Sequence, residues 1–62
     1  MTDYTVENHG SLYLFRPMNV AANVHLHANV GEAQWFGNAL AVESRYARDL
    51  AAQLVDDGFT VS

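Results

Sequence analysis

The sequence predicts a small α+β fold in which two helices lie on one face of an antiparallel sheet. Three observations predict it. The run from Ser11 to Phe15 has the length and the apolar and aromatic composition of a strand. Residues 46–55 keep one apolar stripe at helical spacing. Two short apolar runs flank the pair Gly37-Asn38, as in a β-hairpin.

The N-terminal third predicts one central strand. Residues 1–10 are polar and form either a short edge strand or a loose terminus. In the run that follows, Leu12 and Leu14 share one face of a strand, while Tyr13 and Phe15 share the other. Because both faces are apolar, we expect this strand inside the sheet.

A first helix is predicted after this strand. Pro17 ends the strand and Asn19 is a suitable N-cap residue. Apolar residues recur at helical spacing from Val20 to Ala28, and Asn29 with Gly31 indicates the end of the helix.

Residues 34–42 allow two interpretations. Gly37 either turns a hairpin between 34–36 and 39–42 or forms a bulge in one longer strand. The hairpin gives a miniature ferredoxin-like βαββαβ order over residues 11–61. The single strand gives a three-stranded βαβαβ sheet instead.

The second helix is the clearest element. Ser44 offers a capping hydroxyl, and the apolar stripe then runs from Tyr46 to Val55. Gly58 is the expected helix-ending residue, and Phe59 to Val61 has the composition of a last short strand.

Size and composition predict one domain over residues 1–62. The chain has no cysteine, which excludes disulfides and thiolate metal sites and is typical of a reducing cytoplasm. It has neither a run of about 18 apolar residues nor a basic-then-apolar leader. We therefore expect a cytoplasmic protein with no membrane contact.

The formal net charge of −4 bears on the choice of partner. Three arginines, and no lysine, are too few cations for direct nucleic-acid binding, which requires several phosphate contacts. A basic protein surface is the better electrostatic match. The acids predicted to contact such a partner, a basic nucleic-acid-binding complex, are Glu32, Glu43, Asp49, Asp56 and Asp57.

No pattern in the chain indicates catalysis, so we expect no catalytic, cofactor-binding or metal-ligating residue and no cofactor. His25 and His27 diverge if they lie on a helix, and a zinc site needs about four ligands. The adjacent Asp56 and Asp57 diverge as well, and no glycine-rich phosphate loop is present.

Aromatic residues of the predicted sheet suggest a contact surface. A sheet covered on one face leaves the other open, so some of them are exposed unless the protein dimerises. Tyr13 and Trp35 are the candidates, because exposed Tyr and Trp are frequent at protein interfaces. The chain is then a monomer or a homodimer.

The most specific block of the chain runs from Ala33-Gln34-Trp35-Phe36-Gly37 through Ala39-Leu40-Ala41-Val42-Glu43 to Arg45-Tyr46. With this block the chain resembles, over residues 11–61, a family of short proteins from proteobacteria, their phages and other mobile elements. That family implies no role for any residue. By size, acidity and lack of cysteine, the chain is also similar to anti-CRISPR proteins.

Two functions follow as expectations. The resemblance to anti-CRISPR proteins implies an acidic, non-enzymatic inhibitor that mimics nucleic-acid charge at the DNA-binding surface of a CRISPR effector (Cascade-type) complex. The alternative is a small housekeeping or accessory domain that homodimerises through an exposed sheet.

Overall fold

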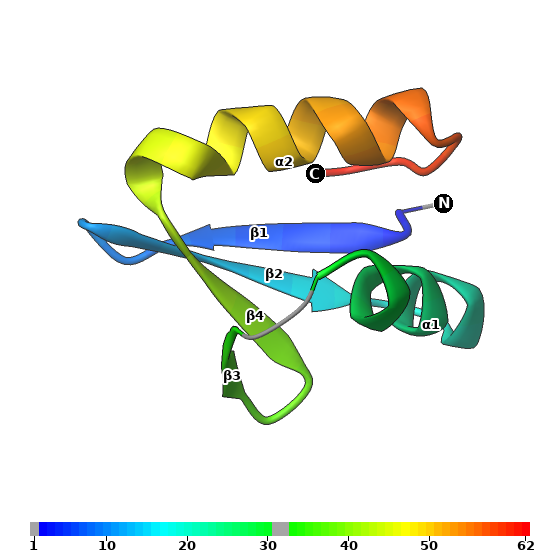
Figure 1. Ribbon diagram of the computed structural model, residues 1–62, viewed down its shortest axis with the longest axis horizontal. Helices are drawn as coiled ribbons and strands as arrows, with labels where there is room; N and C mark the ends of the chain where they lie inside the picture. The colour runs from blue at the N-terminus through cyan, green and yellow to red at the C-terminus, as the bar shows by residue number, and fades with distance from the viewer. Residues whose placement is uncertain (1, 31–32) are drawn as a thin grey trace.

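The computed structural model describes residues 2–30 and 33–62. Their elements follow in the order β1 (Tyr4–Asn8), β2 (Leu12–Pro17), α1 (Val20–Asn29), β3 (Gln34–Phe36), β4 (Ala39–Glu43) and α2 (Ser44–Asp56) (Figure 1). The four strands form one antiparallel sheet in the order β1-β2-β4-β3. The predicted α+β class is confirmed.

The first two strands form a hairpin. Of the two alternatives for residues 1–10, the structure has the strand, and β1 pairs with β2 from Tyr4 opposite Pro17 to Asn8 opposite Tyr13. The turn uses Gly10 at φ +82°, with the Gly10 N–H donating to Asn8 Oδ1 at 2.8 Å. β2 lies between β1 and β4, so the prediction of a central strand is confirmed.

Residues 34–42 form the hairpin and not the bulged strand. β3 pairs with β4 from Gln34 opposite Ala41 to Phe36 opposite Ala39. Gly37 has φ +62° and no non-glycine residue described has a positive φ, which is the sign pattern of a type II′ turn with glycine first. Within the described residues, this pairing ends at Gln34 and Ala41.

Both helices begin close to the predicted residues, but only one has the predicted cap. Asn19 caps α1, its Oδ1 accepting the Ala22 N–H at 2.8 Å, while Gly31 lies outside the described residues. The prediction that Ser44 caps α2 is wrong, because Ser44 is already helical and Glu43 holds the cap position without a side-chain bond. The chain passes directly from sheet to helix here, since the Ser44 N–H donates to the Ser11 carbonyl at 3.0 Å.

The end of α2 is a Schellman motif. Gly58 has φ +95°, and its N–H donates to the Val55 carbonyl at 3.0 Å, while the Phe59 N–H donates to the Leu54 carbonyl at 3.0 Å. The predicted last strand is reduced to one parallel bridge between Val61 and Tyr4, on the outer side of β1.

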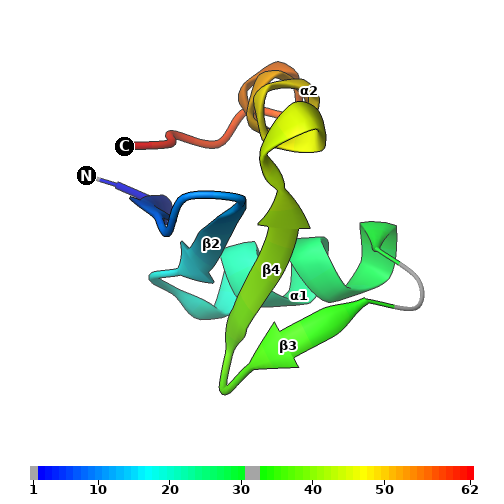
Figure 2. The same ribbon diagram turned by 90° about the vertical axis from the view of Figure 1, so that its left-hand side faces the viewer.

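The core lies between the sheet and both helices (Figure 2). The register places Tyr4, Phe15 and Leu40 on the same face of three adjacent strands. Both helices contribute apolar side chains to that face. Its buried members are Tyr4, Phe15, Ala22, Leu26, Leu40, Ala47 and Leu54.

Asp3 ties the two termini to the start of α1. One carboxylate oxygen of Asp3 accepts the Thr60 N–H at 2.9 Å, and the other accepts the Asn19 side-chain amide at 2.8 Å. The hydrogen bond from the Thr60 backbone is the main cause that lowers the pKa of Asp3 below its ordinary value of 3.8. No local sequence pattern predicts this connection, because Asp3, Asn19 and Thr60 are far apart in the chain.

Candidate binding surfaces

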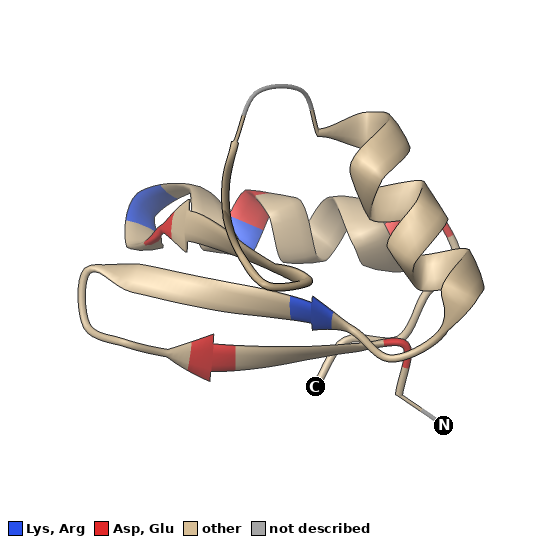
Figure 3. Cartoon of the chain, turned by 90° about the horizontal axis from the view of Figure 1, so that it is seen from below, with Lys and Arg blue, Asp and Glu red and all other residues tan. Residues whose placement is uncertain are grey.

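The predicted acidic residues do not gather into one patch. On α2 two basic residues, Arg45 and Arg48, are followed by two acidic ones, Asp49 and Asp56, and Figure 3 shows a further acidic and basic pair on the β1–β2 hairpin. Glu43 lies 3.3 Å from the Nε of Arg45. Glu32 lies outside the described residues, so its prediction stays open.

Asp57 is engaged within the chain. Its Oδ2 lies 2.9 Å from His25 Nε2, and its Oδ1 accepts the Gln53 side-chain amide at 3.2 Å. The His25 ring also lies 4.7 Å from the ring of Phe59. This contact holds the middle of α1 against the end of α2, so His25 is partly buried and does not face solvent freely.

Asp49 and Asp56 are the two predicted acids that face solvent without a partner in the described chain. They lie on the outer side of α2, two turns or about 10 Å apart. Arg45 and Arg48 precede Asp49 by four residues and one residue on the same helix. The outer side of α2 is therefore mixed in charge.

The open face of the sheet has an apolar centre. It is the face opposite both helices, and by register it presents Leu12 and Leu14 of β2, Ala41 of β4 and Phe36 of β3. Phe36 remains 50% exposed. A hollow of about 240 Å³ is lined by His9, Leu12, Leu14 and Phe36.

The two aromatic residues predicted for exposure lie on the other face. Tyr13 and Trp35 point toward the helices and pack against the core while partly buried. Trp35 stacks on His27 of α1, with ring centroids 4.0 Å apart and planes 4° from parallel. The exposed aromatic residue of the open face is Phe36.

One sequence signal could have identified Phe36. Trp35 and Phe36 are adjacent on a strand, so they must point to opposite faces, and only one of them can enter the core. Leu12 and Leu14 oppose Tyr13 and Phe15 in the same way. Alternation alone does not tell which face the helices cover.

Two ion pairs border the apolar centre. Within each pair the positive and the negative charge cancel. Glu7 and Arg16, on β1 and β2, lie 2.9 Å apart through Oε1 and Nη1. Glu43 with Arg45 stands at the far end of β4, opposite Leu12. The open face therefore combines apolar side chains with a border of no net charge.

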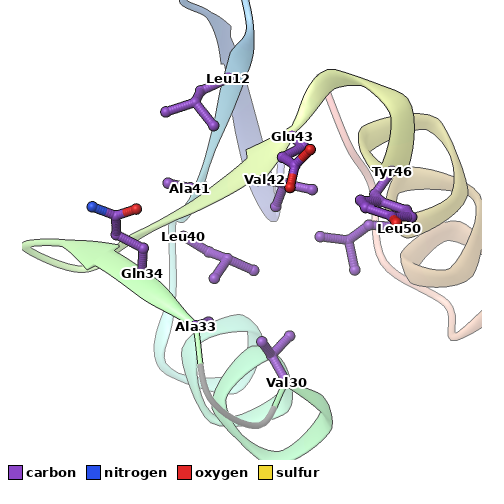
Figure 4. A pocket seen from close by; sticks show the side chains of 10 residues that line it. All are labelled: Leu12, Val30, Ala33, Gln34, Leu40, Ala41, Val42, Glu43, Tyr46 and Leu50. Carbon is purple, nitrogen blue, oxygen red and sulfur yellow. The ribbon is translucent and has the colours of Figure 1, made fainter.

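A second, larger hollow lies between the helices (Figure 4). The helices meet where His25 contacts Asp57 and diverge toward Val30 and Tyr46. The hollow has a volume of about 390 Å³ and lies beside the edge of β4. Its lining residues are Leu12, Val30, Ala33, Gln34, Leu40, Ala41, Val42, Glu43, Tyr46 and Leu50.

The described residues form neither a metal-binding cluster nor a membrane-spanning helix. Nowhere in residues 2–30 and 33–62 do three His, Cys, Asp or Glu side chains come close enough to hold a metal ion. None of the helices described combines the length and the apolar character needed to cross a bilayer.

Comparison with known proteins adds no further constraint. No family model matches the chain, and neither the curated proteins nor the solved structures contain a match. The resemblances inferred from the sequence stay predictions.

Proposed function

We propose that the protein is a non-enzymatic interaction domain that forms a homodimer through the open face of its sheet. The observation that carries the proposal is the uncovered apolar centre formed by Leu12, Leu14 and Phe36. A sheet of this kind buries one face under its helices, and a charged or polar outer face is the usual alternative to a partner. Here the outer face is apolar at Leu12, Leu14, Ala41 and Phe36.

The charge of this face favours a second copy as the partner. A chain of net charge −4 repels itself. The border of the open face, however, consists of the pairs Glu7–Arg16 and Glu43–Arg45, whose charges cancel. Two such faces can therefore approach without like-charge repulsion, whereas a strongly basic or acidic partner gains nothing there.

The size of the molecule limits the strength of such a dimer. Its two largest extents are 26 and 19 Å, which corresponds to a footprint of about 500 Å² per copy and about 1,000 Å² buried in total, the lower limit of specific interfaces. We expect a reversible dimer with a dissociation constant in the micromolar range.

Phe36 supplies the sharpest test. Half of its side chain is exposed, so burying that half contributes about 1 kcal/mol per copy and about 2 kcal/mol per dimer. Phe36→Ser should then weaken dimerisation about 30-fold. Val55→Ser is the matched control, because Val55 is a similarly exposed apolar residue on α2, at 56%.

Sedimentation equilibrium over a range of protein concentrations measures this directly. The proposal expects a dimer that is insensitive to salt, weakened by Phe36→Ser and unchanged by Val55→Ser. A protein that stays monomeric at about millimolar concentration, or a dimer that Val55→Ser weakens as much as Phe36→Ser does, would refute it.

A second candidate function is favoured by the two acids without partners. Asp49 and Asp56 on α2 are free to contact a basic protein surface. In this version the protein is a cytoplasmic inhibitor of a nucleic-acid-binding complex of a bacterial host, such as a CRISPR effector. Asp57 is excluded from the contact, because His25 already binds it.

Capture of the tagged protein's partners from bacterial lysate, with nuclease and at two salt concentrations, tests this version. It expects a salt-sensitive, nuclease-resistant nucleic-acid-binding complex that is lost with Asp49→Asn/Asp56→Asn. The control is Glu7→Gln, which removes one negative charge from the opposite side of the molecule. Equal capture by the double variant and the control would rule the version out.

A further inference from the structure

Among the described residues, β3 pairs with Ala39–Ala41 of β4. The hollow between the helices lies beside the next residues of that strand edge, Val42 and Glu43. The C-terminal end of α1 and the first turns of α2 stand on either side of that edge, as Figure 4 shows. The resulting hollow, about 390 Å³, is within the size range of small-molecule sites.

The lining combines an apolar wall with one charge. Leu40, Val42 and Leu50 form apolar parts of the wall. Among the described residues that line the hollow, Glu43 is the only charged one, with the Gln34 amide and the Tyr46 hydroxyl as further polar groups. A ligand with an apolar body therefore meets a carboxylate at the rim.

The carboxylate of Glu43 can exchange its partner Arg45 for another cation. The Nε of Arg45 lies 3.3 Å from the Oε2 of Glu43. The side chain of Arg45 is 71% exposed and that of Glu43 is 59% exposed. Exposed pairs of this kind contribute little and break easily. The Arg45 guanidinium also lies 4.9 Å from the Tyr46 ring centroid, a second position that it can keep when Glu43 binds another cation.

From these contacts we propose that the hollow binds a small amphipathic cation, with an aliphatic body along Val42 and Leu50 and an ammonium group at Glu43. This site adjoins the dimer face: Leu12 lines both hollows, Ala41 also belongs to the open face, and Glu43 stands at its border. An aliphatic carboxylate of the same length fits the apolar wall equally well but is repelled by Glu43, so charge selection is the feature that distinguishes the site.

The test compares octylammonium with octanoate, followed by the NMR shifts of the Val42 and Leu50 methyl groups. Binding in the millimolar range is expected for a ligand of this size, with octylammonium preferred at least about fivefold over octanoate. Equal affinities, or shifts confined to Leu14 on the open face, would overturn the proposal.

Two pairs of charge variants sharpen the result. Glu43→Gln should reduce octylammonium affinity about fivefold, and Arg45→Gln, which frees the carboxylate, should increase it about twofold. Asp49→Asn and Arg48→Gln change the net charge identically on the same helix but away from the lining. If each control shifts the affinity as much as its partner does, the effect is the general charge of the protein and the proposed site is wrong.

Repeating the titration on Phe36→Ser separates this site from the dimer. Octylammonium binding should be retained in that variant, whether or not wild-type protein dimerises. Loss of binding in a folded Phe36→Ser protein would assign the ligand to the open face and overturn the inference, while leaving the dimer proposal intact.

Discussion

The hydroxyl of Tyr4 offers a direct test of how the sheet and α1 are joined. Tyr4 is fully buried, and its hydroxyl donates to the carbonyl of Ala22 at 2.6 Å. Tyr4→Phe removes this bond and keeps the ring, including its edge contact with Phe59 at 5.5 Å between centroids. The change therefore isolates one hydrogen bond between β1 and α1.

The expected loss of folding stability depends on the Ala22 carbonyl, which remains in the Tyr4→Phe variant. Ala22 lies within α1, so its carbonyl also accepts an intrahelical hydrogen bond and is not left without a donor. The cost should then be that of an ordinary net hydrogen bond, about 1 kcal/mol. In a domain of this size it lowers the melting temperature by about 6 °C.

The same variant has a predicted pH signature. Burial, the largest cause, raises the pKa of Tyr4 above its ordinary value of 10.0, and the charges of Asp3 and Asp57 add to the effect. A pKa raised in the folded state means stability that is complete below about pH 10 and lost as the pH rises further. Tyr4→Phe lacks this loss, so its stability should approach that of the wild type above about pH 10.

Urea unfolding followed by circular dichroism, from neutral pH to about pH 11, measures both effects. Tyr46→Phe is the control, because the Tyr46 side chain is 52% exposed, and it should change the unfolding free energy by less than about 0.5 kcal/mol. The reasoning fails if Tyr4→Phe is as stable as the wild type at neutral pH. It also fails if the difference between the two proteins does not shrink in alkali.

Three other changes test the fold. Because the pKa of Asp3 is lowered in the folded state, its contribution to stability is present above about pH 4 and is lost as the pH falls through the folded pKa. Asp3→Asn should therefore destabilise the protein at neutral pH and flatten its acid unfolding curve. An unchanged curve would contradict this. Gly58→Ala forces a side chain into φ +95°, which should cost about 1–2 kcal/mol in denaturant unfolding; no loss would show that the backbone relaxes. Leu54→Ala, at a side chain only 2% exposed, should cost about 2–5 kcal/mol and leave little folded protein by circular dichroism, whereas Val55→Ala beside it should be nearly neutral.

Most helix and strand boundaries are set by residues close to one another in the sequence. The Asn19 cap and the Gly58 helix end depend on neighbouring residues only, and each lies where the sequence predicted it. At Gly37 the sequence left a turn and a bulge open, and the structure has the turn. The central position of β2 followed from its two apolar faces. Ser44 failed as a cap because a distant carbonyl, that of Ser11, holds its N–H in the sheet.

The binding surfaces depended on contacts that composition does not reveal. Counting acids gave five candidate contacts for a basic partner and left open whether they form one patch. Folding brings His25 to Asp57 and Arg45 to Glu43, so among the described candidates Asp49 and Asp56 are the two without a partner. The sequence indicated that a sheet face would be open without indicating which one.

Alternation along a strand divides its side chains between two faces, and this much the sequence determined by itself: Leu12 and Leu14 against Tyr13 and Phe15. Only the tertiary structure decided which face the helices cover. The larger rings of Tyr13, Phe15 and Trp35 pack beneath α1 and α2, and the leucines with Phe36 remain outside. The physical reason is that burial is a property of the whole assembled sheet, set by the helices that pack on it, whereas periodicity is a property of each strand alone.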